Sequence, residues 1–160
     1  MLGLGATQLE DDMHRLLSSL FHQGVLDDHF SQLQRLQDHD SPNFVVEVVS
    51  IYFRESEKLL TTLRALLLER ECTDYKKMGT HLNRLMGSSS SIGANRVRNV
   101  CVALRTFSER SNRAGCINSL EQLEYEQCLL KSKLHELFQL EQQRLMASGL
   151  GYGYHSIMLD

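Results

Sequence analysis

The chain has 160 residues, of which 42% are hydrophobic and 23% are charged, and its formal net charge is −3 at pH 7. This length is enough for one domain with a substantial hydrophobic core. The small net charge indicates no field strong enough to attract nucleic acid, and the sequence has no run of about 18 apolar residues that could span a membrane. We therefore expect neither nucleic acid nor a membrane as a partner.

The four cysteines are scattered along the chain and lack the Cys-x-x-Cys spacing that is typical of zinc sites and redox motifs. They are Cys72, Cys101, Cys116 and Cys128. The N-terminus also lacks a basic region followed by an apolar block, which is the pattern of a secretory signal. We expect reduced thiols in packed positions, no metal and no cofactor, and a location in the cytoplasm and the nucleus.

Hydrophobic periodicity predicts six helices, and the presence of only one proline favours an all-α fold. The first three helices are expected at residues 9–22, at residues 27–36 and from Ser41 to about Arg70. Gly24 is a suitable stop for the first helix, and Asp27 is a good N-cap for the second. Ser41 followed by proline is a favoured start for the third.

The fourth predicted helix begins after Thr73 or Asp74, either of which can cap it, and it ends or bends at Gly93. A fifth helix is expected to follow from Ala94 or Asn95. The three glycines that follow residue 146 occur without hydrophobic periodicity.

The end of the chain is predicted to contain a turn at residues 111–119, a last helix at residues 118–146 and a flexible tail at residues 147–160. The four long amphipathic helices, joined by short connections, are expected to form an antiparallel four-helix bundle. The two N-terminal helices are additions that cover one end of it. We expect one helical domain at residues 1–146, present as a monomer.

The two N-terminal helices carry more apolar residues than a thin covering of the bundle needs. Phe21, Val25, Leu26 and Phe30 are therefore candidates for an exposed patch, which would be a docking surface. The alternative is that these four side chains simply pack on the bundle.

A column of small residues runs along the fourth predicted helix beside its apolar stripe. It consists of Gly79, Asn83, Gly87 and Ser90 (or Ser91). Glycine inside a helix costs roughly 1 kcal/mol relative to alanine, so two glycines one turn either side of Asn83 need a reason. The reason that we infer is access, because another molecule can approach position 83 closely where side chains are missing.

This stretch resembles the phosphoacceptor helix of the histidine-containing phosphotransfer proteins, most closely the plant ones. The family pattern is a His, two residues and then Lys-Gly-Ser-Ser, continued in plants by Ser-Ser-Ile-Gly. The run from Gly87 to Gly93 matches that pattern, and so does the segment from Arg96 to Cys101. At the two chemically decisive positions the sequence differs, because Asn83 replaces the phosphorylated His and Met86 replaces the Lys.

Family members with an Asn at this place are pseudo-phosphotransfer proteins, which inhibit cytokinin signalling. The resemblance thus implies an HPt-like fold and a catalytically inactive binding module. Its partners would be receiver domains of hybrid sensor histidine kinases, together with those of response regulators. The residues expected to bind the partner are Phe21, Val25, Leu26, Phe30, Gly79, Asn83, Arg84, Met86, Gly87 and Ser90.

Two other functions remain open at this stage. The chain could be an active phosphorelay carrier that uses another histidine, such as His81, although His81 lies beside the apolar stripe and is expected to be partly packed. The chain could also be a structural helical bundle with unrelated partners. Arg84, Arg96 and Arg98 supply positive charge near position 83, which either meets an acidic receiver pocket or is simply solvated.

Overall fold

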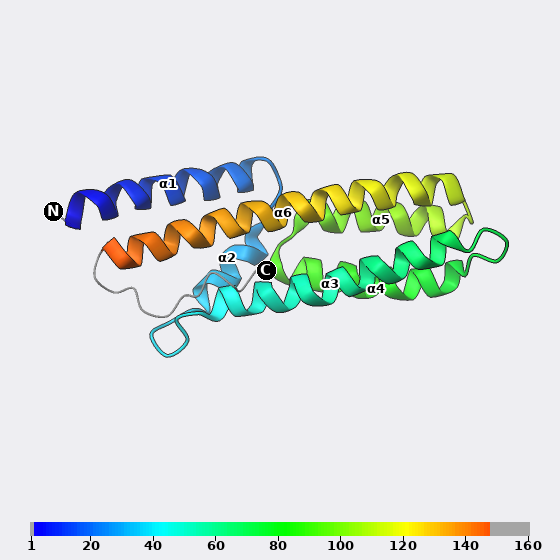
Figure 1. Cartoon of the computed structure of the whole chain (residues 1–160), viewed down its shortest axis with the longest axis horizontal. Coiled ribbons are helices and arrows are strands. Elements are labelled where there is room, and N and C mark those ends of the chain that lie inside the picture. Colours follow the sequence, from blue (N-terminus) through cyan, green and yellow to red (C-terminus); the bar gives the residue numbers. More distant parts are fainter. Residues whose placement is uncertain (1, 148–160) are drawn as a thin grey trace.

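The computed structural model describes residues 2–147, with the backbone alone described at residues 2–4 and 6. These residues form six α-helices and no strand, which confirms the all-α prediction (Figure 1). The helices are α1 (Leu2–His22), α2 (Asp28–Arg35), α3 (Phe44–Leu68), α4 (Tyr75–Ile92), α5 (Asn95–Glu109) and α6 (Arg113–Ala147).

The helices α3, α4, α5 and α6 form an antiparallel four-helix bundle, as predicted. Each of them packs against two neighbours, so that α3 contacts α4 and α6, while α5 contacts the same two helices from the other side. The C-terminal half of α6 extends beyond the bundle, and α1 lies alongside it, while α2 packs against α4 (Figure 1). Both N-terminal helices therefore cover one end of the molecule.

The bundle core is built from one apolar stripe per helix. Leu63 of α3, Leu82 of α4, Leu104 of α5 and Leu123 of α6 each have a relative exposure of 0%. Burying a leucine side chain contributes about 1.5–3 kcal/mol. These four positions alone therefore supply a stabilising contribution comparable with the whole net stability of a typical small domain.

A chain of buried hydrogen bonds joins three of the bundle helices inside this core. The Tyr52 hydroxyl of α3 donates to Gln127 Oε1 of α6 at 2.9 Å and lies 2.9 Å from Ser89 Oγ of α4. Gln127 Nε2 in turn donates to Ser56 Oγ at 2.5 Å. Because a hydroxyl has one proton, and the tyrosine gives its own to Gln127, Ser89 is the donor to Tyr52.

The corner between α4 and α5 is formed by Gly93, which has a φ of +78° and caps α4 in the left-handed conformation. Its carbonyl accepts a hydrogen bond from Asp27 N at 3.0 Å. A Cβ at this position would lie 2.5 Å from the backbone nitrogen of Phe30. Only glycine therefore allows the start of α2 to lie this close to the corner.

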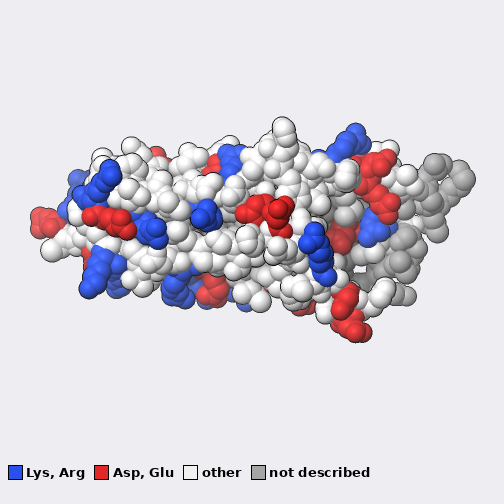
Figure 2. All heavy atoms as spheres, turned by 180° about the vertical axis from the view of Figure 1, so that it is seen from behind, with Lys and Arg blue, Asp and Glu red and all other residues white. Residues whose placement is uncertain are grey.

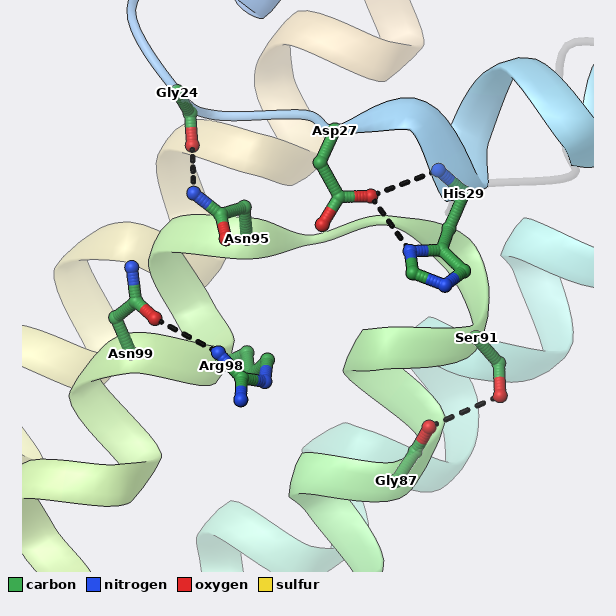
Figure 3. A network of polar contacts seen from close by, with 8 residues as sticks. All are labelled: Gly24, Asp27, His29, Gly87, Ser91, Asn95, Arg98 and Asn99. Atoms are coloured by element: carbon green, nitrogen blue, oxygen red, sulfur yellow. Dashed lines mark hydrogen bonds and ion pairs between the residues drawn. The ribbon is translucent and has the colours of Figure 1, made fainter.

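Further contacts attach the connection between α1 and α2 to the same corner. Asn95 Nδ2, at the start of α5, donates to the carbonyl of Gly24 at 3.2 Å (Figure 3). The Asp27 side chain caps α2 by accepting from His29 N at 2.9 Å. The predicted roles of Gly24 and Asp27 at the ends of their helices are therefore confirmed, and both residues also help to place the N-terminal helices.

The prediction of an exposed patch in this N-terminal region is wrong for three of its four residues. Phe30, Leu26 and Val25 have relative exposures of 0%, 2% and 3%, and Phe21 is half-buried against the core. They pack on the bundle because the Gly93 corner brings α2 directly over the end of α4. Side chains without exposed surface cannot form a docking surface in this conformation.

Some helix boundaries also differ from the prediction. Helix α1 begins at Leu2 rather than at residue 9, because glycines lower helix propensity without preventing a helix. Helix α6 begins at Arg113, so most of the predicted turn at residues 111–119 is helical. The side chain of Asn112 accepts from Gly115 N at 2.9 Å, and Gly115 lies so close to the Phe107 ring that a Cβ there would collide with it.

The start of α3 is also later than expected, since the helix begins at Phe44 rather than near Ser41. The predicted tail at residues 147–160 lies outside the described residues, except that Ala147 is the last residue of α6.

None of the helices within residues 2–147 combines the length and the apolar character needed to cross a membrane. The thiols of Cys101 and Cys116 are buried, whereas those of Cys72 and Cys128 are exposed rather than packed.

We predict that the fold loses stability at alkaline pH because three core groups must stay neutral. Burial raises the pKa of the Cys101 thiol to about 12, and burial likewise raises the pKa values of the Cys116 thiol and the Tyr52 hydroxyl above their usual values. The unfolded chain ionises first, so this stabilisation is complete below about pH 9 and is lost as the pH rises towards the folded-state values. Urea unfolding between about pH 8 and about pH 11 should show the free energy of unfolding fall by up to ~1.4 kcal/mol per pH unit for each group.

The matched control is Cys101→Val, which keeps an apolar side chain of similar size and removes the titrating thiol. It should remove the contribution of Cys101 to the decline and leave the contributions of Cys116 and Tyr52. A free energy of unfolding that stays constant over this pH range would contradict the prediction.

Candidate functional site

The face of α4 that turns away from the core carries the candidate site. Helix α4 begins after Asp74, whose side chain accepts from Lys77 N at 3.0 Å. Its inward face consists of Met78, Leu82, Leu85, Ser89 and Ile92. The rotation of the helix that buries these residues leaves Asn83, Arg84 and Gly87 exposed on the opposite face.

The two glycines beside Asn83 have no packing role within the described chain. A Cβ added at Gly79 or at Gly87 would meet no atom within 4 Å. Both residues lie inside the helix, where glycine costs roughly 1 kcal/mol relative to alanine. These two glycines therefore lower the stability of the helix. They leave the surface on either side of Asn83 without side chains, which supports close approach by another molecule.

Asn83 is held by a residue that the sequence did not single out. Arg105 Nη1 of α5 donates to Asn83 Oδ1 at 3.1 Å, and Arg105 Nε lies 3.8 Å from a Glu109 carboxylate oxygen. The pair lies in a polar groove between α4 and α5. The residues that line this groove are Tyr75, Lys76, Gly79, Thr80, Asn83, Arg105, Ser108, Glu109 and Ser111.

A signal for this contact does exist in the sequence. Helices α4 and α5 form a hairpin around Gly93, and Asn83 and Arg105 lie at roughly equal distances from that corner. Positions that are equally far from a short antiparallel connection tend to lie opposite each other. The contact also depends on where the corner lies and on how far each helix is rotated about its axis, which periodicity alone leaves open.

Met86 lies one turn beyond Asn83 and is half-buried, with its side chain packed against the core. Its thioether therefore partly fills space within the bundle, and only the remaining part is available to a partner. The exposed position next to Asn83 belongs to Arg84. The structure thus brings Arg84, Asn83 and Gly87 together on one surface, with Met86 at its edge.

The serine run following Gly87 is oriented by hydrogen bonds to its own helix. Ser88 Oγ donates to the carbonyl of Leu85 at 3.2 Å, and Ser91 Oγ donates to that of Gly87 at 3.0 Å (Figure 3). Ser90 is half-buried, whereas Ser91 is exposed, so Ser91 is the residue that continues the column of small residues. These hydrogen bonds give the serine hydroxyls partners within α4 itself.

His81 lies on another side of α4 from Asn83 and is half-buried. Its Nδ1 atom is buried and has no hydrogen-bond partner among the described residues. A phosphoacceptor nitrogen must be exposed so that it can attack the aspartyl phosphate of a partner. The burial of Nδ1 agrees with the expectation of a partly packed histidine.

The three arginines considered from the sequence have different surroundings. Arg96 pairs with Glu126, which has a relative exposure of only 3%, at 2.5 Å. Loss of this arginine would leave a buried carboxylate without its partner, so Arg96 is a structural residue. Arg98 is exposed and donates to the side chain of its neighbour Asn99 at 3.2 Å (Figure 3).

One face of the molecule carries charges of both signs. On the face seen in Figure 2, Lys and Arg side chains lie among Asp and Glu side chains over the described residues. Residues 2–147 also bring no three His, Cys, Asp or Glu side chains together in an arrangement that could hold a metal ion. The chemistry of the candidate site is therefore that of its amide, its guanidinium groups and its open backbone.

The sequence of this chain is similar to those of known proteins. The family model "Hpt domain" matches residues 47–143. Pseudo histidine-containing phosphotransfer protein 6 of Arabidopsis thaliana is 65% identical over 152 residues, which cover 95% of this chain and 99% of that protein. Histidine-containing phosphotransfer protein 5 of the same plant is 43% identical over 142 residues, which cover 89% and 90%.

The fold agrees with a solved structure as well. The crystal structure of a histidine-containing phosphotransfer protein from Medicago truncatula is similar with a TM-score of 0.82 and 44% sequence identity, covering 87% of this chain and 94% of that one. The similarity therefore extends beyond the matched family model to the N-terminal helices.

We predict that replacing the two open glycines stabilises the fold. Gly79→Ala and Gly87→Ala should each raise the free energy of unfolding by ~0.5–1 kcal/mol, because alanine has the higher helix propensity and its methyl group meets nothing. Urea unfolding of each variant measures the change. Gly115→Ala is the control for a glycine that is needed by packing, and it should destabilise the fold. If Gly79→Ala or Gly87→Ala is also destabilising, the chain itself needs the space.

Proposed function

The chain belongs to the family of histidine-containing phosphotransfer proteins, as a pseudo member, and we propose that it binds receiver domains without accepting a phosphoryl group from them. By occupying receivers it competes with active phosphotransfer proteins and so inhibits cytokinin signalling. The observation that carries this proposal is the exposed Asn83 between two glycines that the fold does not need.

The exchange of histidine for asparagine removes the reactive atom. A neutral imidazole has a free ring-nitrogen lone pair near pH 7, which can attack an aspartyl phosphate. The amide nitrogen lone pair of Asn83 is delocalised into its carbonyl, and so this residue offers hydrogen bonds in place of a nucleophile. Asn83 can thus contact the active site of a receiver while no covalent step follows.

The replacement at Met86 removes the charge that would stabilise a phosphorylated intermediate. A lysine one turn after the acceptor would neutralise phosphoryl oxygens as a point charge. Met86 is uncharged and partly packed against the core. The first loss prevents the attack on phosphorus, and the second removes the counter-charge of the phosphoryl oxygens, while the open surface made by the two glycines stays available for docking.

Inhibition by such a module depends on mass action. A competitor lowers the occupancy of a receiver by the active protein only when its free concentration exceeds its dissociation constant for that surface. Phosphorelay encounters are transient, so an interface of modest area is expected. We propose the receiver domains of hybrid sensor histidine kinases as the main partners, with response regulators as further ones, in the cytoplasm and the nucleus.

The alternative, an active carrier that uses His81, has less support. The buried Nδ1 of His81 leaves only the other ring nitrogen as a candidate acceptor. A relay assay separates the two functions, because a carrier would accumulate acid-labile phosphate on a histidine while the pseudo protein would accumulate none.

A competition titration tests the proposed inhibition. A receiver domain of a hybrid histidine kinase is titrated with this chain, with an active phosphotransfer protein present as the competitor. We expect saturable binding and displacement of the active protein. Gly79→Ala and Gly87→Ala should each weaken the binding at least about fivefold, although they stabilise the fold, because their methyl groups lie where the partner approaches. Absence of binding to every receiver tried would refute the proposal.

Restoring the lost groups tests the chemistry of the site. Asn83→His should give the chain measurable phosphate acceptance from a phosphorylated receiver, and adding Met86→Lys should increase the amount or the lifetime of the phosphorylated form. The unchanged chain and Met86→Lys alone are the controls, and neither should be labelled. If the double variant binds receivers and still takes no phosphate, position 83 does not lie opposite the receiver aspartate.

A further inference from the structure

The hydrogen bond between Asn83 and Arg105 determines which way the side-chain amide of Asn83 points. A guanidinium has five N–H donors and no acceptor. The atom of Asn83 that lies 3.1 Å from Arg105 Nη1 must therefore be its oxygen Oδ1. With the oxygen turned towards α5, the NH₂ group of Asn83 is left with both of its N–H donors for other contacts.

The support for Arg105 comes from its own helix. The residues of α5 that face the core include Cys101 and Leu104, both with a relative exposure of 0%, so the rotation of α5 is fixed. One turn after Arg105, a Glu109 carboxylate oxygen lies 3.8 Å from Arg105 Nε. The side chain of Arg105 is 38% exposed and that of Glu109 is 70% exposed, so Glu109 is a solvent-facing partner and the hydrogen bond to Asn83 is the closer of the two contacts.

We propose that Arg105 is a positioning residue that fixes the carboxamide of Asn83 with its N–H groups facing the partner. Position 83 then presents hydrogen-bond donors to the partner and selects an oxygen-rich acceptor, which is the carboxylate or phosphorylated carboxylate of the receiver aspartate. This inference rests on the proposed function for the identity of the partner, whereas the orientation of the amide is a property of the free chain.

The physical reason for a fixed amide is that the alternative orientation is repulsive. An unconstrained asparagine rotates by half a turn with little cost, because its terminal torsion is broad and roughly two-fold. In the rotated state its oxygen would face the oxygen atoms of the receiver carboxylate. Arg105 removes this state before binding, so the receiver meets a preorganised donor, and less conformational freedom is lost on association.

The groove beside Asn83 and Arg105 carries the positive charge that is needed to select an anionic acceptor. Lys76 lies along it together with Arg105, and Glu109 is its acidic member. The carboxylate of Glu109 is already engaged with Arg105. An incoming anion therefore meets the amide N–H groups of Asn83 with a guanidinium directly behind them.

The first experiment observes the amide in the free protein by NMR. The side-chain NH₂ resonances of Asn83 are assigned in a ¹⁵N-labelled sample through their absence in Asn83→Ala. Arg105→Gln should shift these two resonances, whereas Arg98→Gln, which removes an exposed arginine from the same helix, should leave them in place. If Arg105→Gln leaves the resonances unchanged, the inference is overturned, whatever the chain binds.

The second experiment is a double-mutant cycle on receiver binding. Arg105→Gln should weaken binding about tenfold in the native chain and less than about twofold in the Asn83→Ala background, because a positioning residue acts through Asn83. Arg105→Lys should restore part of the affinity, and Arg98→Gln should have little effect. An equal loss in both backgrounds would show direct contact between Arg105 and the receiver, and it would overturn the positioning role.

A third variant tests whether receiver binding requires hydrogen-bond donors at position 83. Asn83→Asp keeps an oxygen partner for Arg105, but it places a second acceptor oxygen where the N–H groups were. It should weaken receiver binding more than Asn83→Ala does. Binding by Asn83→Asp as tight as that of the native chain would overturn the inference, while loss of binding by the native chain itself would refute the proposed function instead.

Discussion

The rotation of α4 about its own axis is the constraint on which the candidate site depends. Apolar packing at Leu82 and Leu85 favours one side of the helix, but it tolerates small rotations. The hydrogen bond between Ser89 and Tyr52 tolerates less rotation, because it lies in the core and because the same Tyr52 hydroxyl also donates to Gln127. Rotating α4 would leave buried polar groups without partners, at a cost of about 1–3 kcal/mol each. The polar core thereby directs Asn83 towards solvent.

Four glycines of the described chain form two pairs, of which the fold requires one and is made less stable by the other. Gly93 and Gly115 are required by the fold, because a side chain there would collide with Phe30 or Phe107. Gly79 and Gly87 are open to solvent, and the fold would be more stable without them. A residue that lowers stability and fills no structural need is typical of a functional surface. The separation of the two groups is therefore the strongest structural argument for a docking face on α4.

Sequence reasoning was reliable where the information is local and unreliable where it depends on partners distant in the chain. Periodicity and capping residues predicted six helices, the N-cap at Asp27 and the corner at Gly93. The same reasoning left open whether Val25 and Leu26 form an exposed patch or pack on the bundle, as they do, because an apolar face shows that something covers it without showing what does. Arg105 was missed for a related reason, since its contact with Asn83 depends on how two helices are rotated against each other.

The loss of phosphotransfer chemistry requires little change elsewhere in the molecule. Asn83 is exposed and contacts Arg105, so its identity has little influence on the core. A histidine at that position would occupy the same side of the helix, and the scaffold would keep its N-terminal helices, its polar core and its open glycines. A binding module can therefore arise from a carrier by altering the reactive position while the docking face persists. Under the proposed function, the two proteins differ in whether the group that meets the receiver can form a bond to phosphorus or only a hydrogen bond.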